Sequence, residues 1–96
     1  MTITFENNPK ISIDRTCLQG YIETTYDELV KVFGKPTKLE DDKVTVEWTI
    51  LFSDGTVATI YDWKRSETPM ACYPWHIGGK SQRAVELVTN CMPVTA

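Results

Sequence analysis

Hydrophobic and polar positions alternate most regularly between residues 44 and 52. Every second residue there is bulky and apolar, and most of the residues between are polar. A period of two, rich in β-branched and aromatic residues, predicts a half-buried strand. The dipeptide Asp54-Gly55 follows this strand and favours a two-residue turn. We expect a second strand over residues 57–64, and the two strands then form a β-hairpin. The apolar positions of its first strand are Val44, Val46, Trp48, Ile50 and Phe52.

The length of the turn also sets the expected pairing of the two strands. With two loop residues, Phe52 faces Val57, Trp48 faces Tyr61 and Val46 faces Trp63. These pairs share one face, and their large aromatic side chains make it the core side. The opposite face then places Glu47 against Asp62. Two opposed carboxylates are unfavourable without a cation, and Lys64 is the nearest one on that face.

Helical spacing predicts two short helices. The first covers residues 26–33, where Thr25 and Glu28 have the spacing of a capping box. Gly34 suits the position after the helix, and Pro36 prevents its continuation.

The second helix is expected over residues 81–91, with Ser81 as its cap and Pro93 beyond its end. Its expected core-facing residues are Ala84, Val85, Val88 and either Cys91 or Met92.

Weaker alternation at residues 2–5 and 11–13 is typical of a short ribbon, and residues 19–22 and 73–77 are expected as short strands. The 96 residues allow one domain, residues 1–96. We therefore predict an α+β fold: an antiparallel sheet of three to five strands built around the central hairpin, with two short helices packed on one face.

Composition narrows the function classes. The chain is 42% hydrophobic and 24% charged, with 10 Lys and Arg against 13 Asp and Glu, for a net charge of −3. This balance disfavours proteins that coat nucleic acid or bind anionic membranes. Three cysteines without disulfide or zinc spacing, no signal peptide and no long apolar run predict a reduced, cytoplasmic protein without metal or cofactor.

Gly78, Gly79, Lys80 and Ser81 form the first candidate site, at the start of the second predicted helix. Backbone N–H groups at a helix N-terminus, with a lysine and a serine, can hold a phosphate or carboxylate. The segment lacks the first glycine of a P-loop, because Pro74 stands at that position. The alternative interpretation is a connector followed by a helix cap.

His76 is the only histidine and follows Cys72 by four residues. No further residues lie at zinc spacing, and a role as a catalytic base needs an orienting group that the sequence does not identify. We therefore expect no enzymatic activity. A structural or interface histidine is the alternative that we favour.

A partner-binding surface is the third candidate. Tyr21, Tyr26, Tyr73 and Trp75 cluster near the predicted loops, and aromatic residues in loops beside glycines are typical of binding surfaces. The acidic run Glu40-Asp41-Asp42 would steer this surface, with His76 beside it, toward a basic partner. The alternatives are aromatic residues that cap the core and an acidic run that is solvated.

Several segments together resemble small accessory proteins that many bacteriophages carry. They are TTYDELVKVFGKP (residues 24–36), VEW (46–48), DGTVATIYDWK (54–64) and WHIGG (75–79). The stretch between the last two, residues 65–74, is shorter here than in the phage proteins. The resemblance implies an anti-defence role such as that of anti-CRISPR inhibitors.

The sequence thus predicts a non-enzymatic inhibitor that binds a host defence protein with a basic surface, and neither nucleic acid nor membrane. The alternative is a nucleotide- or phosphate-binding protein that uses Gly78 to Ser81, with Trp75 or Tyr73 stacking on a base. An enzyme with His76 as base ranks last. A homodimer through the hairpin edge is compatible with each.

Overall fold

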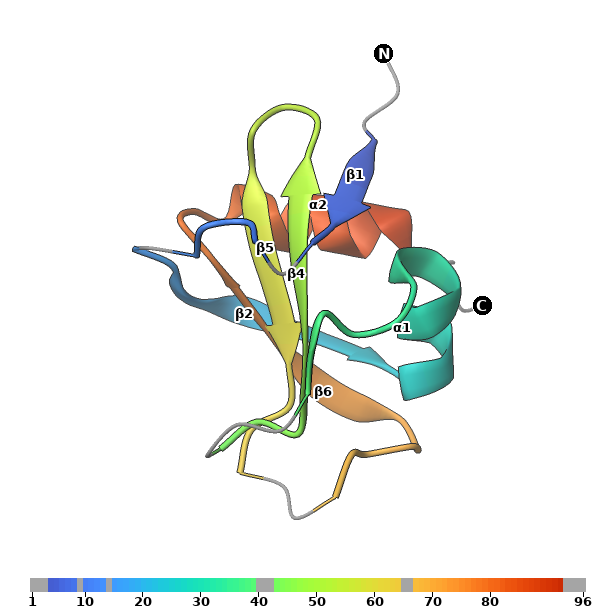
Figure 1. Cartoon of the computed structure of the whole chain (residues 1–96). Helices are drawn as coiled ribbons and strands as arrows, with labels where there is room; N and C mark the ends of the chain where they lie inside the picture. The colour runs from blue at the N-terminus through green and yellow to red at the C-terminus, as the bar shows by residue number, and fades with distance from the viewer. Residues whose placement is uncertain (1–3, 9, 14, 40–42, 65–66, 93–96) are drawn as a thin grey trace.

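The computed structural model describes residues 4–8, 10–13, 15–39, 43–64 and 67–92. Its strands and helices follow an α+β order that confirms the predicted class (Figure 1). They are β1 (Phe5–Asn7), β2 (Cys17–Thr24), α1 (Tyr26–Phe33), β3 (Lys38–Leu39), β4 (Val46–Phe52), β5 (Val57–Tyr61), β6 (Tyr73–Gly79) and α2 (Arg83–Cys91).

One antiparallel sheet contains all the strands. Five of them follow the order β1-β4-β5-β6-β2, and the two-residue β3 also pairs with β4. β1 and β2 are consecutive in the chain but lie at opposite ends of this order. The predicted ribbon of residues 2–5 and 11–13 is therefore wrong, because β1 pairs with β4 and residues 11–13 form no strand. Residues 2 and 3 lie outside the described residues.

The central hairpin forms, but its register differs by one residue from the predicted one. Leu51 pairs with Val57, where a two-residue loop would have placed Phe52. The loop consists of residues 53–55, its Gly55 amide donates to the Phe52 carbonyl (2.9 Å), and Gly55 has a φ of 92°. A three-residue loop of this kind requires a left-handed residue at its end, which glycine adopts without strain.

A one-residue shift in register changes which residues of β5 share a face with those of β4. Tyr61, predicted on the core side, instead pairs with Glu47 on the opposite face. Asp62, predicted to oppose Glu47, is 0% exposed on the core side. Its carboxylate accepts hydrogen bonds from Thr45 N (2.8 Å), Thr45 Oγ1 (2.5 Å) and Val46 N (3.4 Å), which replace water around the buried charge.

Helix α1 has the predicted ends. The Thr25 hydroxyl accepts a hydrogen bond from Glu28 N (3.2 Å), and Gly34 after the helix has a φ of 87°. Helix α2 begins two residues later than predicted, with Gln82 at the N-cap position. The Ser81 hydroxyl still accepts from Arg83 N (3.3 Å).

Side chains from both helices join one hydrophobic core with alternate residues of the sheet. Leu87, missed by the sequence analysis, is buried in α2 with Ala84 and Val88, whereas Val85 is only half-buried. Figure 1 shows α2 behind β4 and β5. The buried members of the core are Leu29, Phe33, Val46, Trp48, Ile50, Phe52, Ala58, Ile60, Trp75, Ile77, Ala84, Leu87 and Val88.

Candidate functional site

An exposed group of aromatic side chains lies on the sheet face opposite the core. We call it the aromatic patch, and it consists of Tyr21 on β2, Tyr61 on β5, Trp63 just after β5, and His76 on β6. Tyr21 is 55% exposed and Trp63 is 40% exposed. Tyr61 and His76 are half-buried between them.

Strand register explains how these residues meet. His76 lies directly opposite Tyr21 on one side and Tyr61 on the other. Directly opposite residues on neighbouring strands have side chains on the same face and in contact. The His76 ring centroid is 4.9 Å from that of Tyr21, 5.3 Å from that of Tyr61 and 6.2 Å from that of Trp63. His76 is therefore the centre of the patch.

Gly78 leaves the space in which the Thr59 hydroxyl lies, beside Tyr61. It stands two residues after His76, on the same face of β6, and pairs with Thr59. A Cβ atom at this position would collide with the Thr59 hydroxyl and lie 3.5 Å from a Tyr61 ring carbon. Glycine is thus required here by close packing under the patch.

Charged groups border the aromatic patch on two sides. The Lys43 ammonium lies 5.7 Å from the centre of the Trp63 ring. Glu47 pairs with Tyr61 across the sheet, and Glu23 is an exposed residue on the same face of β2 as Tyr21. Burial, and secondarily the Glu47 carboxylate, raise the pKa of Tyr61, so its hydroxyl stays neutral at physiological pH.

His76 is an uncharged member of the patch at neutral pH. Burial lowers the pKa of its imidazole, and the Asp62 carboxylate partly offsets this effect. Its Nδ1 atom is buried without a hydrogen-bond partner. Among the described residues, no group of three His, Cys, Asp or Glu side chains is placed to hold a metal ion. The aromatic patch and the charged residues beside it thus offer a binding partner aromatic ring surfaces and charged groups.

The structure corrects the predicted docking role of Trp75. Its side chain is 0% exposed, and its indole nitrogen donates to the Thr24 carbonyl (3.0 Å). Because strand residues alternate between faces, Trp75 lies in the core while its neighbour His76 lies in the patch. Tyr73, on the core side with Trp75, is half-buried, and its hydroxyl accepts a hydrogen bond from Trp63 N (3.1 Å). Tyr73 therefore fixes the backbone at the edge of the patch.

The residues of the predicted phosphate site, Gly78 to Ser81, do not stand directly at the start of a helix. Gly78 and Gly79 belong to β6, where they are buried and pair with β5 and β2. Lys80 and Ser81 are exposed, and α2 begins only at Arg83. The four residues thus run from a strand into a turn before α2, and anion binding by them stays a prediction.

Glu40, Asp41 and Asp42, the acidic residues of the predicted interface, lie outside the described residues. Lys43, the next described residue, contacts the patch through Trp63.

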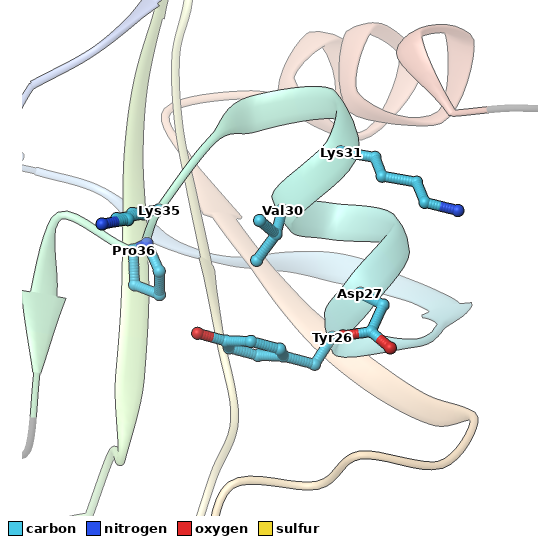
Figure 2. A pocket seen from close by; sticks show the side chains of 6 residues that line it. All are labelled: Tyr26, Asp27, Val30, Lys31, Lys35 and Pro36. Carbon is cyan, nitrogen blue, oxygen red and sulfur yellow. The ribbon is translucent and has the colours of Figure 1, made fainter.

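A groove beside α1 is the second surface feature of interest. It has a volume of about 620 Å³, and Figure 2 shows Tyr26, Val30 and Pro36 facing this space. Lys31 points away from the groove in Figure 2, and its ammonium lies 3.6 Å from the Glu28 carboxylate. The groove thus offers mainly apolar walls. Its lining residues are Tyr26, Asp27, Val30, Lys31, Lys35 and Pro36.

Sequence reasoning named Tyr21 and His76 as candidates for a binding surface but missed Tyr61 and Trp63. Tyr61 and Trp63 were assigned to the core because the predicted register placed them there. A three-residue loop between β4 and β5 would have predicted their position. With that loop, Tyr61 pairs with Glu47 and lies on the face opposite the core.

Comparison of the chain with protein-family models, with curated proteins and with solved structures found no match. Within the described part of the chain, neither helix has the length and apolar character needed to cross a membrane.

Proposed function

We propose that this protein acts by binding another protein through the aromatic patch, as a non-enzymatic, phage-type inhibitor of a host defence system. The observation that carries the proposal is the exposure of Tyr21 and Trp63 within one continuous set of ring contacts. Tyrosine and tryptophan are enriched among the residues that dominate binding energy at protein interfaces.

The position of the patch supports the same conclusion. The patch residues come from three strands, and the cross-strand pairing of Tyr21, His76 and Tyr61 holds their rings in place. A preformed aromatic surface loses little conformational entropy when a partner binds. The resemblance to phage accessory proteins supports the inhibitory role, because such small proteins act on the machinery of the host.

A plating assay tests the proposal. The protein is expressed in a panel of bacterial strains that each carry one defence system, and the plating efficiency of phage is measured. We expect the wild type to restore plating in a strain whose defence protein it binds. The Trp63→Ala variant should lose this effect, because truncating a central interface aromatic costs roughly 2 kcal/mol, or about 30-fold in affinity.

Met70→Ala is the matched control, since Met70 is 57% exposed and does not belong to the patch. This variant should act as the wild type does. Thermal unfolding of both variants checks that each is folded. Full activity of folded Trp63→Ala, or no effect of the wild type in any strain, would contradict the proposal.

A further inference from the structure

We infer that the aromatic patch receives an arginine side chain of the partner protein. This inference rests on the proposed function and adds the chemistry of the contact. A guanidinium group is planar, carries a full charge and stacks on aromatic rings while its N–H groups reach carboxylates.

Lys43 shows that the patch already attracts a cation. Its ammonium lies 5.7 Å from the Trp63 ring centre, within the distance at which the electron-rich ring face stabilises a positive charge. The Lys43 carbonyl accepts a hydrogen bond from Lys64 N (2.8 Å), which fixes the backbone of Lys43 beside the residue that follows Trp63. Lys43 thus lies near the Trp63 ring, and Tyr21, which is 55% exposed, is open to a cation from a partner.

Two carboxylates select a cation in preference to an anion. Glu23 lies two residues beyond Tyr21 on the same face of β2, and Glu47 lies opposite Tyr61. The Glu23 carboxylate, on the same strand face, can accept charge-assisted hydrogen bonds from a guanidinium on the Tyr21 ring, while Glu47 adds negative charge at the other side of the patch. The net charge of −3 also attracts a basic partner at long range.

The same charges disfavour a nucleotide, the other planar ligand that stacks on aromatic rings. A nucleotide stacked on Tyr21 would carry its negative phosphates into the neighbourhood of the Glu23 carboxylate, where like charges repel. Arginine satisfies both the rings and the carboxylates.

An NMR titration tests the inference with a blocked Gly-Arg-Gly tripeptide as the probe. We expect the Trp63 indole signal and the Tyr21 amide signal to shift as the peptide is added. The same tripeptide with citrulline, which has the same shape without the charge, should produce at most small shifts.

Trp48 and Trp75 serve as internal controls, because both are 0% exposed and their indole nitrogens donate to the carbonyls of Gly34 and Thr24. Their indole signals should not move.

Two charge variants sharpen the test. Glu23→Gln should weaken binding of the arginine peptide roughly two- to fivefold, and Lys43→Gln should strengthen it by a similar factor because it removes the competing cation. Glu86→Gln on α2 is the matched control and should leave the affinity unchanged.

Equal shifts with the citrulline peptide, larger shifts with adenosine monophosphate, or unchanged affinity in both charge variants would overturn the inference. The proposed function fails separately, through full activity of Trp63→Ala in the plating assay. If Trp63→Ala is inactive and the arginine peptide shows no preference over citrulline, only the arginine inference is wrong.

Discussion

His76 is the residue whose position in the patch has the clearest measurable consequence. Its ring touches the rings of three neighbours, and its Nδ1 atom is buried without a partner. A proton on this imidazole would place a charge in a partly dehydrated site. Burial therefore keeps the pKa of His76 below its ordinary value of 6.5.

Because of this lowered pKa, the free energy of unfolding should decrease as the pH is lowered. Above about pH 6.5, His76 is neutral in both the folded and the unfolded chain, and its neutral form contributes fully to stability. As the pH falls below 6.5, the unfolded chain takes up the proton first, and stability is lost until the folded pKa is passed. Urea unfolding between pH 7.5 and 5 measures this loss.

His76→Gln is the control for that measurement, because glutamine does not titrate. The variant should lose less stability than the wild type over the same pH interval. An identical pH dependence in the two proteins would show that other groups cause it.

At the scale of the elements, the hairpin loop decides which face each side chain of β5 occupies. The three residues 53–55 set the register, and Gly55 closes the loop with a φ of 92°. A second fixed point is the contact between the loop and α2, where Arg83 Nε lies 3.2 Å from the Asp54 carboxylate. The outward position of Tyr61, and with it the patch, depends on this short loop.

Gly55→Ala should destabilise the protein by about 1 kcal/mol, because an L-residue is strained at this backbone conformation. A Cβ atom at Gly55 meets no other atom within 4 Å, so a steric clash does not contribute. Gly55→Asn is the comparison variant and should cost less, since asparagine tolerates the left-handed region better. Chemical denaturation of the three proteins tests the order wild type, Asn variant, Ala variant.

At the scale of the whole molecule, the sheet joins segments that are far apart in the chain. β1 pairs with β4, and β2 pairs with β6, while both helices contribute to the same core as β4 and β6. Neither helix can therefore leave the structure without exposing apolar surface of the sheet.

Helix loss and core exposure should consequently occur at the same denaturant concentration. Circular dichroism at 222 nm follows the helices, and tryptophan fluorescence follows Trp48 and Trp75, which are buried in the core. Coincident midpoints are expected. An earlier loss of helical signal would show that the helices unfold separately from the sheet.

Local patterns predicted much of this architecture. The capping box of α1 and its terminal Gly34 lie where the sequence placed them, because a cap is decided by residues three or four positions apart. The central hairpin was predicted for the same reason. Its register was wrong, since two-residue and three-residue loops suit the same Asp-Gly pair and differ only in how the strands pack.

The patch required more than local patterns. Trp75 and His76 are adjacent in the chain, and either one is compatible with an interface role from sequence alone. The pairing of β6 with β2 and β5 places His76 between Tyr21 and Tyr61 and turns Trp75 into the core. Such pairings between distant strands leave no periodic signal within either strand.

By itself, the sequence determined the fold class, the first helix and the existence of the central hairpin, because these follow from periodicity and from residues close together in the chain. Only the tertiary structure decided the order of the strands, the burial of Asp62 and Trp75, and the assembly of the aromatic patch. Each of these depends on which strands become neighbours and in which register, and a shift of one residue exchanges the buried face for the exposed one.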